Sequence, residues 1–138
     1  MEINNKKLRV GIIGCGNIFP MHAESIKQKC KNCADLVAVC DIKNNKLKSA
    51  VLKYKCKGYK NYKNMLNNEN LDIVHICTPH YLHKEMSIYA ASKKVNIFLE
   101  KPMALNVEDA VAMKNACQLN GVELMIGHAL RFWGEYKK

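Results

Sequence analysis

The 138-residue sequence contains no long hydrophobic run. No stretch approaches the roughly 20 consecutive apolar residues that span a bilayer. The segment from Met1 to Lys7 is polar, and no apolar core of a signal peptide follows it. We therefore expect a cytoplasmic protein without membrane contacts. A content of 49% hydrophobic and 25% charged residues indicates a single globular domain.

The seven cysteines lack the arrangement of a metal site. Cys30 and Cys33 have the spacing of a zinc-binding pair, but no second pair of Cys or His residues stands at an interval that would complete four ligands. A free thiol in an apolar segment behaves as a small hydrophobic side chain. Most of the remaining cysteines lie in or beside such segments, namely Cys15, Cys40, Cys77 and Cys117. We expect reduced cysteines and no bound metal.

Arginine is scarce, with Arg9 and Arg131 alone, although the formal net charge is +10. The lysines are dispersed over the polar faces of several expected helices, and no combination of aromatic and basic residues matches the signature of an RNA-binding segment. Because a high positive charge is one feature of nucleic-acid-binding proteins, that class stays a remote alternative. We expect no nucleic-acid partner.

Apolar segments with strand character alternate along the chain with segments of helical periodicity. This alternation predicts an α/β fold with a doubly wound, mostly parallel sheet, right-handed crossovers and the strand order 3-2-1-4-5-6. No internal repeat or linker appears before Gly127. The expected strands are residues 8–13, 35–40, 57–59, 71–77, 95–99 and 122–126. The expected helices lie at about residues 17–29, 47–54, 62–67, 82–89 and 106–120.

A glycine pair follows the first expected strand directly, in the run Gly14-Cys15-Gly16. In a dinucleotide-binding turn the first glycine permits the tight bend, and the second lets backbone N–H groups approach a pyrophosphate at a helix N-terminus. The position of the usual third glycine is occupied by Phe19, so the helix must sit farther from the strand or Phe19 must point away. The context of strand, turn and helix favours a nucleotide site.

Asp41 stands at the end of the second expected strand. A carboxylate there accepts hydrogen bonds from the adenosine ribose and repels a 2′-phosphate, which favours NAD over NADP. Lys43, two residues later, leaves NADP as an alternative cofactor. The other interpretation is a pair of turn glycines with Asp41 as a helix cap.

The triplet Glu100-Lys101-Pro102 ends the fifth expected strand, at the edge where open α/β sheets bind ligands. A lysine amine there can act as acid, base or electrostatic clamp, whereas the alternative is a solvated lysine after a strand. His80 and His83 follow the fourth strand, where cofactor contact and helix capping are both open. We expect His75 to be a buried, hydrogen-bonded histidine and His22 to serve packing.

With these motifs together, the sequence resembles the glucose-fructose oxidoreductase, inositol dehydrogenase and rhizopine-catabolism family of NAD(P)-dependent enzymes. The segments that carry the resemblance are residues 11–18, 76–83, 99–105 and 127–132. The resemblance implies a dinucleotide-binding Rossmann domain over residues 1–127. It also implies that residues 128–138 begin the connection to a C-terminal substrate domain that this chain does not contain.

The family's contacts can be transferred to matching positions in this sequence. The resemblance implies a pyrophosphate turn lined by Gly14, Cys15, Gly16, Asn17 and Ile18, with Asp41 on the adenosine ribose. It implies a wall near the nicotinamide half formed by Thr78, Pro79, His80 and His83, with Glu100 on the nicotinamide ribose and Lys101 beside the substrate carbon.

The reaction implied by the resemblance is hydride transfer between nicotinamide and a secondary alcohol of a sugar, cyclitol or related polyol. In this reaction Lys101 would assist movement of the hydroxyl proton, and the full-length protein would form a homo-oligomer. We expect the chain alone to be inactive, because the family takes further acid–base residues from its second domain. The alternative is a non-catalytic NAD(P)-binding module or nucleotide sensor.

Overall fold

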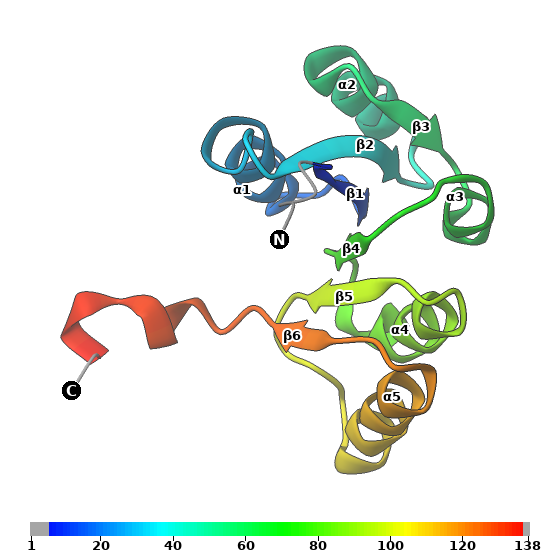
Figure 1. Cartoon of the computed structure of the whole chain (residues 1–138), viewed down its shortest axis with the longest axis vertical. Coiled ribbons are helices and arrows are strands. Elements are labelled where there is room, and N and C mark those ends of the chain that lie inside the picture. The colour runs from blue at the N-terminus through cyan, green and yellow to red at the C-terminus, as the bar shows by residue number, and fades with distance from the viewer. Residues whose placement is uncertain (1–5, 137–138) are drawn as a thin grey trace.

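The computed structural model describes residues 6–136, which form a sheet of six parallel strands with helices on both faces (Figure 1). The strands are β1 (Leu8–Ile13), β2 (Ala34–Cys40), β3 (Lys57–Tyr59), β4 (Ile73–Ile76), β5 (Asn96–Leu99) and β6 (Leu124–Ile126). Their spatial order is β3-β2-β1-β4-β5-β6, and every neighbouring pair is parallel. The structure confirms the predicted Rossmann fold and its strand order.

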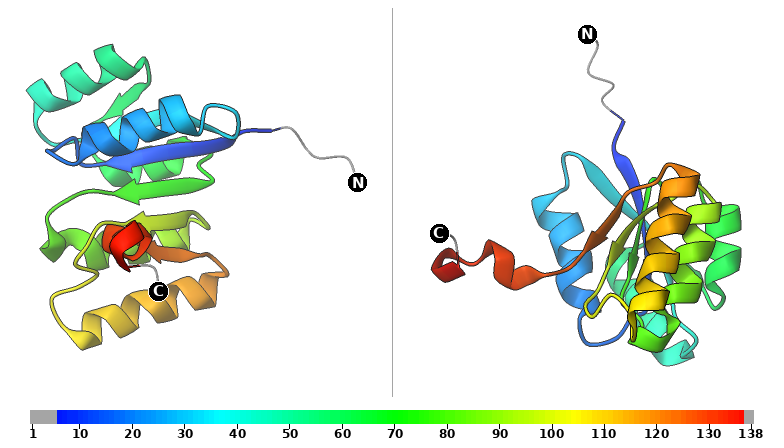
Figure 2. Two further views of the ribbon diagram at one scale, coloured as in Figure 1. Left: turned by 90° about the vertical axis from the view of Figure 1, so that its left-hand side faces the viewer. Right: turned by 90° about the horizontal axis from the view of Figure 1, so that it is seen from below.

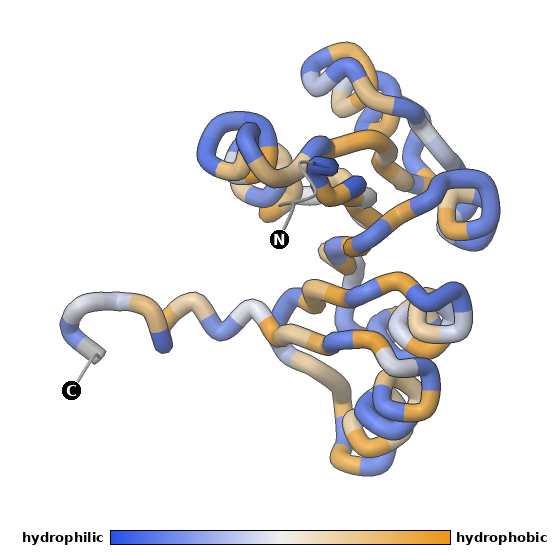
Figure 3. Tube along the Cα trace, in the orientation of Figure 1, coloured by the Kyte–Doolittle hydropathy of each residue, from blue (hydrophilic) through white to orange (hydrophobic). Residues whose placement is uncertain are grey.

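The hydrophobic core consists of two clusters of side chains. Helices cover both faces of the sheet (Figure 2). They are α1 (Phe19–Glu24), α2 (Asn44–Tyr54), α3 (Tyr62–Asn68), α4 (His83–Ser92) and α5 (Val107–Asn120). Side chains of α1 and α2 belong to one cluster, and side chains of α3, α4 and α5 belong to the other. Along the helices, hydrophobic positions alternate with hydrophilic ones (Figure 3). Among residues 6–136, no helix has the length and hydropathy needed to cross a membrane.

Two helices show how local sequence sets their position. In α2, Leu47, Ala50 and Tyr54 recur at helical spacing and are buried on one side. At the start of α5 the Oδ1 atom of Asn106 accepts a hydrogen bond from the backbone N–H of Asp109 at 2.8 Å. Such a cap satisfies an N–H group that has no partner within the helix.

Several elements differ from their predicted bounds by one to three residues, and two of the differences are informative. The first helix ends as an α-helix at Glu24 and continues as a π-helical turn over Ser25–Lys29, a difference that the spacing of apolar residues does not reveal. The fourth strand was predicted over residues 71–77 but spans Ile73–Ile76. Leu71 is buried against Gly11 without joining the ladder, so its apolar character reports burial and not strand pairing.

The segment after β6 leaves the sheet, as expected. It forms short 3-10 turns at Ala129–Phe132 and Gly134–Tyr136 that extend away from the rest of the chain (Figures 1 and 2). The side chains of Phe132 and Trp133 are exposed. Residues 137 and 138 of the predicted connection lie outside the described residues.

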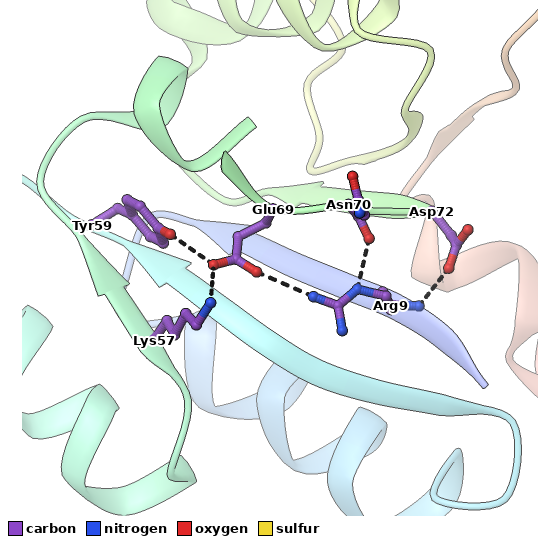
Figure 4. Close-up of polar contacts among 6 residues, drawn as sticks. All are labelled: Arg9, Lys57, Tyr59, Glu69, Asn70 and Asp72. Atoms are coloured by element: carbon purple, nitrogen blue, oxygen red, sulfur yellow. Dashed lines mark hydrogen bonds and ion pairs between the residues drawn. The ribbon is translucent and has the colours of Figure 1, made fainter. Parts of the chain in front are cut away.

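The buried carboxylate of Glu69 joins three parts of the fold (Figure 4). The Glu69 side chain, 2% exposed, lies 3.1 Å from the Arg9 guanidinium and 2.9 Å from the Lys57 ammonium. It also accepts a hydrogen bond from the Tyr59 hydroxyl at 2.6 Å. Arg9 belongs to β1, whereas Lys57 and Tyr59 belong to β3, so Glu69 connects an inner strand to the edge strand. Sequence analysis did not predict this cluster.

Candidate functional site

The glycine turn after β1 has a conformation that requires glycine at one position. Gly14 has a φ of +97°, and a Cβ atom added there would lie 2.7 Å from the carbonyl oxygen of Cys77. A Cβ atom added to Gly16 would meet no protein atom within 4 Å. The backbone conformation of the turn therefore requires glycine at position 14. Contacts among residues 6–136 do not require glycine at position 16. The open space above Gly16 fits a ligand that approaches the backbone.

The side chains beside the glycines point in different directions. Cys15 is buried, and burial, with smaller effects from Asp41 and other groups, raises the pKa of its thiol to about 12. Asn17 is exposed and Ile18 is half-buried. Phe19 is buried with its ring centroid 5.4 Å from that of Tyr54 in α2. Phe19 thus replaces the usual third glycine by pointing toward α2, which is one of the two arrangements expected from the sequence.

Asp41 holds the glycine turn to the end of β2. Its Oδ2 atom accepts a hydrogen bond from the backbone N–H of Cys15 at 2.8 Å, and its Oδ1 atom accepts one from the backbone N–H of Lys43 at 2.7 Å. The N-cap residue of α2 is Lys43, and no side chain caps that helix. Asp41 is therefore not the helix cap of the alternative interpretation. Each carboxylate oxygen retains a lone pair that can accept a further hydrogen bond.

The loop after β4 brings the predicted wall residues together, but with unequal exposure. Pro79 and His80 are exposed, and Thr78 is half-buried with its hydroxyl 3.4 Å from the Met86 sulfur. His83 is 1% exposed, and its two ring nitrogens each lie 3.0 Å from a carbonyl oxygen, one of Thr78 and one of Pro102. His83 thus links the loop after β4 to the loop after β5 from inside the protein.

Glu100 and Lys101 point to different environments at the end of β5. The Glu100 carboxylate is largely buried, 2.7 Å from Nε2 of His22, and its other oxygen accepts a hydrogen bond from the backbone N–H of Lys101 at 3.3 Å. The Lys101 side chain is exposed. Within residues 6–136 its ammonium group forms no hydrogen bond or ion pair with another side chain. Lys101 is therefore a cation available to a ligand at this edge.

Two histidines are linked to Glu100 by a chain of hydrogen bonds. Nδ1 of His22 lies 3.0 Å from Nδ1 of His75, and the rings of both contact Phe98. Burial, and secondarily the nearby His22, lowers the pKa of His75 to about 4. His75 is hydrogen-bonded as expected but is half-buried instead of fully buried, and the contact of His22 with Glu100 was not predicted. The strand register pairs His75 with Phe98 and places them side by side, whereas no sequence signal indicates the contact of His22 with Glu100.

Two hollows lie near the glycine turn and along α5. A hollow of about 290 Å³ separates the turn at Gly16 from Lys46 and Ser49 of α2. A hollow of about 990 Å³ lies between α5, β6 and the loop at Met103–Val107, on the other side of the sheet from α1. The structure over residues 6–136 shows no group of three or more His, Cys, Asp and Glu side chains arranged for a metal ion.

Comparison with known proteins identifies the family of this chain. Residues 8–128 match the GFO_IDH_MocA family model, described as an oxidoreductase family with an NAD-binding Rossmann fold. The chain is 33% identical over 132 residues to myo-inositol 2-dehydrogenase of Thermotoga maritima, covering 95% of this chain and 39% of that protein. It is 38% identical over 100 residues to 2,7-anhydro-N-acetylneuraminate hydratase of Mediterraneibacter gnavus, covering 72% and 26% respectively.

A solved structure gives the same result for the fold. The WlbA dehydrogenase of Bordetella pertussis, in complex with NADH and UDP-GlcNAcA, superimposes with a TM-score of 0.91 at 31% identity. The match covers 95% of this chain and 40% of that chain, so this chain spans about two fifths of such relatives. On the match over residues 8–128 and the shared architecture, the chain belongs to the GFO_IDH_MocA oxidoreductase family and is an NAD-binding Rossmann domain.

Proposed function

We propose that this chain is the cofactor-binding part of an NAD(P)-dependent dehydrogenase that acts on a secondary alcohol of a sugar, cyclitol or related polyol. The observation that carries the proposal is the arrangement at the carboxyl ends of β1, β2 and β5. A glycine turn with open space above Gly16, the Asp41 carboxylate and the exposed Lys101 side chain lie along this one edge. Open α/β sheets bind ligands at this edge.

The residues present fit a dinucleotide. Backbone N–H groups from Gly16 to Ile18 precede or begin α1 and are suited to a pyrophosphate. Asp41, already oriented by two backbone N–H groups, has lone pairs left for the adenosine ribose hydroxyls. Thr78, Pro79 and His80 stand on the accessible side of the loop after β4 and would border the nicotinamide half.

We assign the proton transfer at the substrate hydroxyl to Lys101. When bound, the nicotinamide supplies a hydride acceptor or donor. The Lys101 amine, as free base, takes the proton from the substrate hydroxyl, and as ammonium it stabilises negative charge on the alcohol oxygen. Its lack of an ion pair within residues 6–136 keeps it available for both roles.

NAD is the cofactor that Asp41 favours. A 2′-phosphate placed on the adenosine ribose would meet the negative charge of this carboxylate, which is held in place by Cys15 and Lys43. Lys43 and Lys46, which are close in sequence, reduce this repulsion without removing it. We therefore expect NADH to bind more tightly than NADPH, with both binding measurably.

The domain assignment follows from the same proposal. Residues 1–127 would form the dinucleotide-binding domain, and residues 128–138 would lead into a substrate domain that supplies the remaining acid–base residues and the contacts of a homo-oligomer. The exposed Phe132 and Trp133 stand at this transition. We accordingly expect no appreciable turnover of inositols or aldoses by the 138-residue chain alone.

Binding and turnover test this proposal separately. Titration of the 138-residue chain with NADH, followed by nucleotide fluorescence, should show saturable binding, and its absence with both NADH and NADPH would refute the cofactor assignment. The product of the complete reading frame should reduce NAD⁺ when inositols or aldoses are supplied. One relative is named a hydratase, so the assay must measure whether NADH accumulates as the substrate is consumed. Addition of water to the substrate without accumulation of NADH would refute the dehydrogenase assignment.

A further inference from the structure

A line of hydrogen-bonding side chains runs from the interior of the sheet to the proposed nicotinamide side of the site. It consists of His75 in β4, His22 in α1 and Glu100 at the end of β5. Nδ1 of His75 lies 3.0 Å from Nδ1 of His22, and Nε2 of His22 lies 2.7 Å from Oε1 of Glu100. The three residues belong to three separate elements and are brought together only by the fold.

The chemistry of these groups determines the direction of the hydrogen bonds. An ionised carboxylate only accepts, so Nε2 of His22 carries the proton in its bond to Glu100. The low pKa of His75, about 4 because of its burial and secondarily because of His22, makes it neutral at pH 7. In the tautomer of His22 with its proton on Nε2, the Nδ1 atom accepts a hydrogen bond from the N–H group at Nδ1 of His75. The ring of His22 is then held at both nitrogens.

The surroundings leave these side chains little freedom to rotate. The Phe98 ring centroid lies 5.5 Å from that of His22 and 4.8 Å from that of His75. At the end of β6, a Cβ atom added to Gly127 would come within 3.2 Å of the Phe98 ring and 3.5 Å of Oε1 of Glu100. Glycine at this position therefore leaves space for both side chains.

We propose that His22 is a positioning residue, which holds the Glu100 carboxylate so that its remaining lone pairs face the nicotinamide ribose. The second Glu100 oxygen accepts the backbone N–H of Lys101, so the same contact also orients the start of the Lys101 segment. The inference rests on the proposed function, because it needs a dinucleotide at this edge. It assigns to His22 a role beyond joining α1 to the sheet.

The experiment compares ligands that do or do not contain the second ribose. NADH and ADP-ribose contain it, whereas ADP does not. The 138-residue chain and its variants are titrated with all three ligands by calorimetry. In the variant His22→Leu the Glu100 carboxylate loses its donor, and we expect NADH and ADP-ribose to bind about tenfold more weakly while ADP binding changes less than about twofold.

Two variants separate positioning from simple loss of packing. In His22→Gln an amide N–H group reaches a similar place and can still donate to Glu100, so affinity for NADH should return to within about threefold of the original chain. Gln28→Leu makes a matched polar-to-apolar change at an exposed position shortly after α1 and should leave all three affinities unchanged. Equal weakening of ADP and NADH by His22→Leu, or no recovery in His22→Gln, would overturn the proposal.

A measurement on the unmodified chain applies even where a variant fails to fold. Nitrogen-15 NMR of the histidine rings should show Nε2 of His22 protonated at pH 7, and Glu100→Gln should move the signal of this proton. A His22 ring without a proton on Nε2 would overturn the proposal. Failure of the original chain to bind NADH would refute the proposed function instead, so the two failures are distinguishable.

Discussion

The buried Glu69 carboxylate offers the sharpest test of what stabilises this fold. We predict that Glu69→Gln, which keeps the shape of the side chain but removes its charge, destabilises the chain. The carboxylate, 2% exposed, is contacted by Arg9 at 3.1 Å, by Lys57 at 2.9 Å and by the Tyr59 hydroxyl at 2.6 Å. The variant would leave an amide facing two cations and would lose the charge-assisted part of three contacts.

The magnitude follows from the exposure of the partners. Breaking a fully buried ion pair costs about 3–5 kcal/mol. The side chains of Arg9 and Lys57 are 36% and 69% exposed, so water solvates them once the carboxylate is gone and part of the loss is recovered. We therefore expect a loss of about 2–3 kcal/mol in the free energy of unfolding, or roughly 10 °C in Tm.

The dependence on pH gives this prediction a second, independent signature. Burial tends to raise the pKa of Glu69, but the hydrogen bonds from Tyr59 and Lys57 and the charges of Lys57 and Arg9 outweigh it and lower the pKa. A carboxylate with a lowered folded-state pKa contributes its full stability above the unfolded value of about 4.3. That contribution is lost as the pH falls through the folded-state pKa. The difference between the two proteins should therefore shrink below about pH 4.

Urea unfolding followed by circular dichroism at pH 7 and at successively lower pH measures both effects. Glu123→Gln is the matched control, because Glu123 is exposed and its carboxylate forms no contact within residues 6–136; it should change stability by less than about 0.5 kcal/mol. A loss for Glu69→Gln no larger than that of the control would refute the reasoning. So would a difference that stays constant on acidification.

Four further predictions concern the glycine turn and the cysteines. Gly14→Ala should cost at least about 2 kcal/mol by thermal denaturation, because its φ of +97° and the nearby backbone exclude a Cβ atom. Gly16→Ala should leave Tm within about 2 °C but weaken NADH binding, and a large loss of Tm would show that the protein itself needs this glycine. Asp41→Ser should raise the ratio of NADPH to NADH affinity about tenfold in parallel titrations, whereas an unchanged ratio would remove Asp41 from cofactor choice. Iodoacetamide at pH 8 should modify the exposed Cys33 in the native chain and spare Cys15, whose burial raises its thiol pKa to about 12; equal labelling by peptide mass spectrometry would contradict this.

The fold was predictable where a local pattern reports directly on burial or backbone shape. Leu47, Ala50 and Tyr54 of α2 recur at helical spacing and are buried, and Asn106 caps α5 through the residue three positions later. Gly14 has the positive φ that a tight turn after a strand demands. The predictions were less accurate at element ends, as for Leu71, because an apolar side chain can be buried without its backbone joining a strand.

Part of the candidate site was also predictable from local patterns in the sequence. The glycine turn, Asp41 and the Glu100-Lys101 pair each follow a strand, and the carboxyl ends of parallel strands share one edge. The partners of these residues were not predicted. His22 was interpreted as packing, and nothing near it in sequence indicates the Glu100 carboxylate with which it pairs.

The sequence by itself determined the alternation of strands and helices, the strand order, the glycine turn and the family. These depend on periodicity, backbone conformation and short motifs, all of which act over a few neighbouring residues. Only the tertiary structure decided which polar groups meet. The partners His22 and Glu100 are 78 positions apart, His22 and His75 are 53 apart, and Arg9 and Glu69 are 60 apart. Such contacts arise because the packing of helices on the sheet brings distant residues within hydrogen-bonding distance, and in the low-dielectric interior each polar group must find a partner.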